Sequence, residues 1–196
     1  MTAVATKKES DDRSGTAQID PDLAAVAASL HGEVPDVLAV RTIRIACDKA
    51  HAVAVVQDMG MLTTYEQKAR VVQAQPASAR TGRYSVTGRL AGLLPWRGTF
   101  SYLLHGDGFH SADSTARPNG WRVSGGFVVY DVPSGGCEVM HYECYDLPHW
   151  PRPARRVLRA YMRNSQRREL YIIHDLALLR SAEARARREI AVGPAS

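Results

Sequence analysis

The sequence predicts an α+β domain in which a curved, seven-stranded antiparallel sheet wraps around one long C-terminal helix and leaves an internal cavity. Three observations predict it. Apolar residues alternate with period two through the middle of the chain. The breaks between these runs are short and rich in Gly, Pro and Asn, which suits hairpins and is too short for parallel crossovers. The last forty or so residues repeat with the helical period.

Composition is consistent with one globular domain. The chain has 196 residues, of which 45% are hydrophobic and 23% charged, which argues against a wholly disordered or collagen-like protein. No apolar run approaches the ~18 residues of a membrane-spanning helix. The amino terminus lacks the apolar core of a secretory signal. The three cysteines form no CxxC or other metal-ligand spacing, so we expect a cytoplasmic protein without a disulfide framework.

The first third of the chain predicts a tail, one strand and three short helices. Residues 1–20 are polar and aperiodic, which predicts a disordered tail. Residues 21–35 predict a short helix that starts at Pro21, followed by a linker. A β-branched run predicts a strand over 37–46, and Asp48 caps a helix expected over 49–57. A further short helix is expected over 61–65.

Six more strands follow, joined by turn sequences such as Gly106-Asp107-Gly108 and Pro118-Asn119-Gly120. The expected ranges are 68–74, 82–90, 97–105, 109–116, 121–132 and 138–145. A long helix is expected from about Pro153 to Arg188, with one face that is apolar except at Ser165 and Glu169. This helix should cover the apolar face of the sheet. We therefore expect a domain over 36–188 and a C-terminal tail over 189–196.

This element order, together with the segments 88–92, 124–127 and 139–148, resembles the START/Bet v 1-like (SRPBCC) helix-grip superfamily. The nearest likeness is to polyketide cyclase/dehydrase and aromatase-like proteins, and it covers about Val37 to Leu179. None of the segments is an active-site signature. The resemblance therefore implies the fold more strongly than the reaction, because one fold hosts many functions.

Alternation leaves two choices for the last strand, because Val139, His141, Glu143 and Tyr145 share one face and the residues between them share the other. The resemblance implies that the first set faces inward, where relatives tend to have apolar residues. This sequence departs from them by placing an imidazole and a carboxylate there. A register slip of one residue would send both to solvent.

The same reasoning identifies the residues expected to line the cavity. Expected catalytic residues are His141, Glu143, Glu169 and Tyr102. Expected substrate-binding residues are Tyr65, Tyr84, Trp96, Phe100, Trp121, Phe127, Tyr145, Tyr161 and Ser165.

Acid–base chemistry is the activity that these residue types favour. The Cα atoms of His141 and Glu143 should lie roughly 6.5–7 Å apart on one strand face. An imidazole and a carboxylate in an apolar pocket suit proton abstraction and return, and tyrosines can hydrogen-bond an enolate oxygen. Such a set suits cyclisation and dehydration of a polyketide-like chain, without a cofactor or metal. Two alternatives stay open: an ordinary polar pair, and a zinc site completed by His110 or His149.

Positive charge is concentrated near the carboxy terminus. Residues 151–189 contain eleven arginines and four acidic residues, a net charge of +7, whereas the whole chain carries +5. This pattern is typical of a solvated helix face, or of a docking surface for an acidic partner such as an acyl carrier protein. No nucleic-acid motif accompanies it. The expected partner is a hydrophobic small molecule, whether as a substrate or as a lipid or quinone that is only carried, and the expected state is a monomer or homodimer.

Overall fold

The computed structural model describes residues 34–90, 92–113 and 120–192. Its first strand, β1 (Val37–Ile45), leads into helix α2 (Lys49–Val56), the 3-10 turn η1 (Met59–Met61) and helix α3 (Leu62–Tyr65). The strands that follow are β2 (Ala69–Pro76), β3 (Thr81–Leu90), β4 (Leu94–His105), β5 (Gly108–Asp113), β6 (Arg122–Asp131) and β7 (Cys137–Asp146). Helix α4 (Arg152–Val192) completes the fold. The expected tail over 1–20, the helix within 21–35 and the end of the fifth strand at 114–116 lie outside the described residues.

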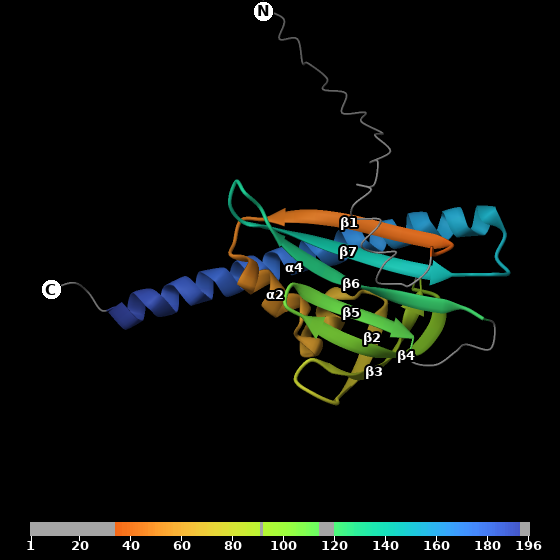
Figure 1. Ribbon diagram of the computed structural model, residues 1–196, viewed down its shortest axis with the longest axis horizontal. Helices are drawn as coiled ribbons and strands as arrows, with labels where there is room; N and C mark the ends of the chain where they lie inside the picture. The colour runs from red at the N-terminus through yellow and green to blue at the C-terminus, as the bar shows by residue number, and fades with distance from the viewer. Residues whose placement is uncertain (1–33, 91, 114–119, 193–196) are drawn as a thin grey trace, which may run out of the picture.

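The seven strands form one antiparallel sheet in the order β1-β7-β6-β5-β4-β3-β2. The first and last strands of the chain pair directly, with Val37 opposite Tyr145 and Ile45 opposite Cys137. The sheet curls, and α4 runs alongside β1 and β7 on its inner side (Figure 1). The predicted α+β architecture, with one long C-terminal helix against an antiparallel meander, is confirmed.

Helix α4 is longer than the sequence predicts. It begins at Arg152 and continues to Val192, so the first four residues of the expected tail over 189–196 are helical. No glycine or proline interrupts the chain between Pro153 and Gly193, so nothing ends the helix earlier. Its C-terminal part extends beyond the sheet (Figure 1), where Ile190 is 81% exposed. Leu179, which the helical period placed on the apolar face, is also 56% exposed.

Both faces of β7 are buried, which explains why its composition alone did not show which face is inside. The face of Val139, His141, Glu143 and Tyr145 is turned toward α4. The alternate residues Met140, Tyr142 and Cys144 are fully buried in a second apolar layer on the opposite face. The structure thus has the register that the resemblance implied.

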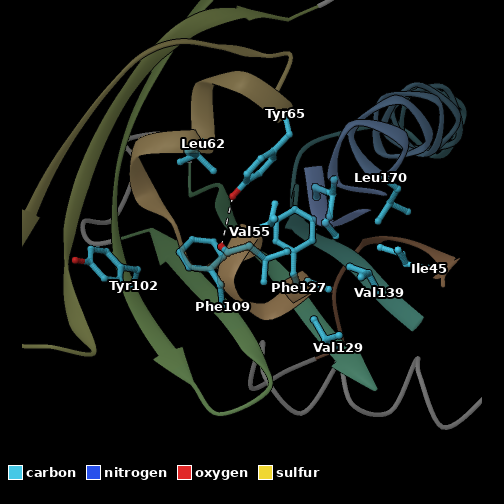
Figure 2. Packing of buried hydrophobic residues seen from close by; sticks show 14 of the residues in the cluster. Ile45, Val55, Leu62, Tyr65, Tyr102, Phe109, Phe127, Val129, Val139 and Leu170 are labelled. Atoms are coloured by element: carbon cyan, nitrogen blue, oxygen red, sulfur yellow. Dashed lines mark hydrogen bonds between the residues drawn. The ribbon is translucent and has the colours of Figure 1, made fainter. Parts of the chain in front are cut away.

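Between the sheet and the helices lies an aromatic-rich core. The rings of Tyr65, Phe109 and Phe127 gather there with Val55 and Val139 (Figure 2). The ring of Phe127 meets that of Tyr65 edge-on with centroids 5.6 Å apart, and that of Phe109 at 6.5 Å. Within the described residues, no helix is both long enough and apolar enough to cross a bilayer.

Replacing Phe127 by alanine should lower the free energy of unfolding by about 3–5 kcal/mol, because the buried ring would leave a cavity that its neighbours fill only in part. Urea titration followed by circular dichroism measures the change. The matched control is Leu103→Ala on β4, a side chain that is 45% exposed, which we expect to cost less than about 1 kcal/mol. A loss at Phe127 no larger than at Leu103 would contradict this core.

Candidate functional site

A group of ionisable side chains is buried between β7, α4 and the segment that joins α3 to β2. We call it the acid–base cluster. It consists of Glu66, Lys68, His141, Glu143, Tyr145, Ser165 and Glu169. Glu169 is fully buried, His141 is 3% exposed and Lys68 is 5% exposed. Buried charged groups are uncommon in proteins, and they need partners to be tolerated.

The ammonium group of Lys68 lies at the centre of the cluster. Its Nζ is 2.8 Å from Glu143 Oε1, 3.2 Å from Glu66 Oε1 and 3.4 Å from Glu169 Oε1. One cation therefore holds three carboxyl groups that come from three separate parts of the chain.

Hydrogen bonds fix the backbone of Lys68. Its carbonyl accepts from Trp96 Nε1 at 2.9 Å and from the Arg89 amide at 3.1 Å. Gly88 leaves the room for this approach, because a Cβ at that position would lie only 1.7 Å from the Lys68 carbonyl oxygen. These contacts fix the backbone just before β2, and the side chain of Lys68 extends from there into the core.

Strand and helix periodicities bring the other members together. His141, Glu143 and Tyr145 alternate along the inner face of β7. Ser165 and Glu169 are one helical turn apart on α4, and the serine hydroxyl donates to Glu169 Oε1 at 2.7 Å. The hydroxyl of Tyr145 donates to Glu143 Oε1 at 3.1 Å. His141 Nδ1 lies 3.2 Å from Glu169 Oε2, and its ring stacks on Phe127 with centroids 4.2 Å apart.

The cluster contains more carboxyl groups than cations. Burial, followed by the charge of Glu169, raises the pKa of Glu66 to about 7. Burial also raises the pKa of Glu169, although Lys68 opposes the shift. Burial would raise the pKa of Glu143 too, but Lys68 and His141 together lower it on balance. Glu143 therefore stays ionised, while burial favours the protonated form of Glu66 and Glu169, so this pair retains a proton near neutral pH.

Lys68 and His141 respond to the same surroundings in opposite ways. Burial tends to lower the pKa of Lys68, but the carboxylates of Glu143, Glu169 and Glu66 raise it well above its ordinary value, so Lys68 stays charged. Burial lowers the pKa of His141 to about 4. The imidazole is therefore neutral at pH 7 and acts there as a hydrogen-bonding group and not as a cation.

Three buried atoms of the cluster lack a hydrogen-bond partner in the part of the chain that the structure describes. They are Glu143 Oε2 and the facing pair His141 Nδ1 and Glu169 Oε2, which lie 3.2 Å apart without hydrogen-bond geometry. Buried polar atoms are nearly always paired in proteins. A ligand or water molecule that reached this cluster would find one donor or acceptor on an imidazole and two acceptors on carboxyl groups.

Of the predicted site residues, the structure brings Phe127, Tyr145 and Ser165 into contact with His141, Glu143 and Glu169. Trp96 donates to the backbone carbonyl of Lys68, and the remaining predicted residues make their described contacts elsewhere. Tyr65 is buried, and its hydroxyl donates to the Val56 carbonyl at 3.5 Å (Figure 2), so it does not mark an opening. Trp121 packs edge-on against Trp150, in a small cluster that includes Tyr161.

An aromatic row forms a second group on β3, β4 and β5. Tyr84 stacks on Phe100 with centroids 5.2 Å apart, and its hydroxyl donates to Ser111 at 3.0 Å. Trp96 meets Phe100 edge-on. Tyr102 lies over Gly82, where a Cβ would come within 2.6 Å of its hydroxyl oxygen. The described contacts of Tyr102 are with this row and not with the acid–base cluster.

Sequence reasoning missed Glu66 and Lys68. A lysine at the start of a strand usually faces solvent, and nothing in its local pattern indicated burial. The available signal was nearness to Tyr65, itself a predicted site residue: Glu66 directly follows it, and Lys68 comes two residues later. His110 cannot complete a zinc site with His141 and Glu143, because it lies on the opposite face of the sheet. There its Nδ1 is 2.6 Å from the Tyr142 hydroxyl. Among the described residues, no three His, Cys, Asp or Glu side chains are arranged to hold a metal ion.

Solved structures with the same arrangement of strands and helices include aromatase/cyclases and START domains. The Zhui aromatase/cyclase from a Streptomyces species is 13% identical, with a TM-score of 0.63 over 73% of this chain and 94% of its own. The chain has the START/SRPBCC helix-grip fold.

Two further helix-grip structures differ more in length or function. The di-domain aromatase/cyclase StfQ of the steffimycin pathway is 10% identical, with a TM-score of 0.64 over 74% of this chain, which spans only 52% of that protein. The human StarD13 lipid transfer and protein localization domain is 8% identical, with a TM-score of 0.54 over 71% of this chain and 76% of its own. No family model and no curated protein sequence matches this helix-grip chain.

Replacing Glu66 by glutamine should stabilise the folded protein relative to wild type, and this advantage should grow as the pH rises. Between about pH 4.5 and 7 the folded protein holds a proton on Glu66 that the unfolded chain has released, so this residue lowers wild-type stability as the pH rises through that window. Glutamine resembles the protonated form and has no such loss. The stability difference between variant and wild type should grow by on the order of 3 kcal/mol across the window. Urea unfolding at pH values from 4.5 to 8 measures it.

His141 has the opposite effect on the pH dependence of stability. Its pKa is lowered in the folded protein, so it makes the protein more stable as the pH rises from about 4 to 6.5. Burial is the main cause of that shift and the charge of Glu66, which opposes it, the smallest, so most of this contribution is common to both proteins and cancels in the comparison. The matched control is Glu183→Gln on the exposed side of α4, which should show no pH-dependent difference. A Glu66→Gln difference that stays constant from pH 4.5 to 8 would show that Glu66 is not buried in this cluster.

Proposed function

We propose that this protein is an enzyme that binds a polyketide-like or related natural-product intermediate in an internal cavity and catalyses its cyclisation and dehydration by general acid–base catalysis. The observation that carries the proposal is one buried lysine among three carboxyl groups, with a carboxyl of pKa about 7 beside it. A general acid or base works best when its pKa lies near the operating pH. Perturbed ionisable groups of this kind are concentrated at functional sites.

Each group in the cluster has a role in this proposal. Glu169, whose Oε2 accepts no hydrogen bond although His141 Nδ1 lies 3.2 Å away, takes a proton from the acidic carbon between two carbonyl groups. Lys68 and Tyr145 stabilise the negative charge that develops on the enolate oxygen. The enolate carbon then bonds to a second carbonyl carbon, and protonated Glu66 supplies the proton for its oxygen. Loss of a further C–H proton and of that hydroxyl releases water and leaves a double bond.

The remaining residues hold this arrangement. Glu143 stays ionised and anchors both Lys68 and Tyr145. Neutral His141 lies against Glu169 and is held flat by Phe127. The aromatic row of Tyr84, Phe100 and Tyr102 would supply an apolar surface along which a flexible chain folds into reactive contact. Tyr102, predicted from the sequence to be catalytic, is in this proposal a binding residue, because its described contacts are with the aromatic row.

The proposed setting is the cytoplasm, with the protein acting as a monomer or homodimer. An acyl carrier protein is the proposed donor of the substrate, and it would dock on the arginine-rich helix α4. Charge complementarity supports this partner, because exposed arginines follow one another along the helix.

Replacing Glu169 by glutamine should lower the cyclisation rate about 100-fold or more, because the amide keeps the hydrogen-bond acceptor for Ser165 but cannot take a proton. The probe is the N-acetylcysteamine thioester of 3,5,7-trioxooctanoate, with cyclised products followed by mass spectrometry against the uncatalysed rate. The wild-type rate should fall as the pH rises through about 7, where Glu66 loses its proton.

The matched control is Glu183→Gln, an exposed glutamate on the same helix, which should leave the rate unchanged. Equal unfolding temperatures of the two variants would show that a lost rate is chemical and not a consequence of unfolding. Unchanged turnover in Glu169→Gln, or no acceleration by the wild-type protein, would overturn the acid–base proposal.

Non-catalytic binding or transport of a lipid, quinone or other hydrophobic molecule is the second candidate function. The aromatic row favours it, because stacked and tilted rings offer an apolar surface and the hydroxyl of Tyr84 is already bonded to Ser111. The likeness to the human lipid transfer domain also suits it.

Native mass spectrometry of freshly purified protein should separate the two functions. The enzymatic proposal predicts the mass of the bare chain, since substrate and product must leave on each turnover. Carriage predicts one intact hydrophobic molecule per chain, released on denaturation. A stoichiometric lipid together with no turnover of the tetraketide probe would favour carriage over catalysis.

A further inference from the structure

Helix α4 presents arginines on the flank opposite to the acid–base cluster. Arg163, Arg167 and Tyr171 follow one another at intervals of four residues and therefore lie on one helical stripe. Ser165 and Glu169 point to the other side of the same helix, toward His141 and Lys68. The helix thus separates a carboxyl-rich interior from an arginine-rich flank.

A hydrogen bond fixes where this flank meets the sheet. The side chain of Gln166, between the two arginines in sequence, donates from Nε2 to the Ala39 carbonyl of β1 at 2.9 Å. Arg41 follows two residues later on the same face of β1, the face that packs against α4. Because β1 is an edge strand, the side chains of Arg41, Arg163 and Arg167 come together where the helix crosses the sheet edge.

In the part of the chain that the structure describes, no acidic side chain pairs with these three arginines. Burial and then the charges of Arg163 and Arg167 lower the pKa of Arg41, and no carboxylate contributes to its surroundings. Within the described residues, none of the three forms an ion pair. The Nε atoms of Arg41 and Arg163 are buried and have no hydrogen-bond acceptor. Two buried donors without an acceptor, beside three like charges, form an arrangement that an anion would complete.

We propose that Arg41, Arg163 and Arg167 form a binding site for a phosphate-type oxyanion at the edge of β1. A guanidinium group presents paired N–H donors that match two oxygens of one phosphate, and charge-assisted hydrogen bonds of this kind are the strong ones. A tetrahedral oxyanion offers enough oxygens to serve two guanidinium forks at once, and its charge offsets the repulsion among the three arginines. The site is separate from the acid–base cluster, so phosphate binding can be tested whether or not the protein catalyses cyclisation.

Titration of the wild-type protein with inorganic phosphate tests the site directly. The ¹H–¹⁵N signals of the arginine Nε–H groups should be followed at low ionic strength, with sodium chloride at matched ionic strength as the reference. The Nε–H signals of Arg41 and Arg163 should shift saturably with phosphate and not with chloride. This measurement uses the unaltered protein, so it does not depend on any variant folding. Absence of a saturable shift at either Nε–H would overturn the proposal.

Variants then locate the site. Arg41→Gln and Arg163→Gln should each weaken phosphate binding about tenfold or more, as expected for the loss of a charge-assisted, forked contact. The matched control is Arg168→Gln, an exposed arginine on the same helix that lies about 100° around the helix axis from Arg167, and it should change the affinity less than about twofold. An equal loss in Arg168→Gln would show that the helix attracts phosphate only through its net charge.

Vesicles distinguish the source of the phosphate group. Binding to phosphatidic acid vesicles that is lost in Arg41→Gln would assign the site to a lipid headgroup. Binding of inorganic phosphate without vesicle binding would assign it to a soluble phosphate ester. Vesicle binding that is the same in Arg41→Gln and wild type, with no response to inorganic phosphate, would contradict the site.

Discussion

The ion contacts of Lys68 are the constraint on which the interior of this protein depends. Its ammonium group lies 2.8 Å from Glu143 and 3.4 Å from Glu169, so β7 and α4 are both tied to the segment before β2. Removing one partner of a buried charge group is strongly destabilising, because it leaves the others uncompensated in a medium of low dielectric constant. An apolar core of similar volume would be at least as stable. The cluster is therefore better explained by what it can do chemically than by its contribution to folding.

The fold supplies what such a cluster needs. The Lys68 carbonyl is held by Trp96 and Arg89, and Gly88 is the residue that allows this contact. The stacking of Phe127 on His141 and the bond from Ser165 to Glu169 restrict the other side chains. A group whose pKa is tuned by burial must be kept buried and oriented, because water would return its pKa to the ordinary value. The rigid antiparallel sheet and the single long helix provide this from opposite sides.

Much of the architecture followed from periodicity and turn chemistry, because alternation, short Gly- and Pro-containing breaks and a final helical stretch leave few antiparallel arrangements. The inward direction of His141 and Glu143 did not follow from composition, since Met140, Tyr142 and Cys144 on the other face are buried as well. The resemblance to helix-grip proteins supplied that register. Lys68 and Glu66 could not be predicted, because their burial depends on Gly88 and Trp96, which approach through the pairing of β2, β3 and β4. Such contacts between distant segments leave no local trace in the sequence.

The excess of carboxyl groups over cations accounts for the protonation behaviour of the whole site. With one lysine and a neutral imidazole, three ionised carboxylates would leave two uncompensated negative charges in the core, which is prohibitive at low dielectric constant. Glu143, nearest to Lys68, keeps its charge, and the remaining pair, Glu66 and Glu169, retains a proton. A second lysine would have ionised all three carboxyls, and an arginine-rich interior would have suited an anion instead. The fold places Arg163 and Arg167 on the outer flank of α4 and Glu169 on the inner one, so a mobile proton, not a fixed charge, is what the interior presents to a ligand.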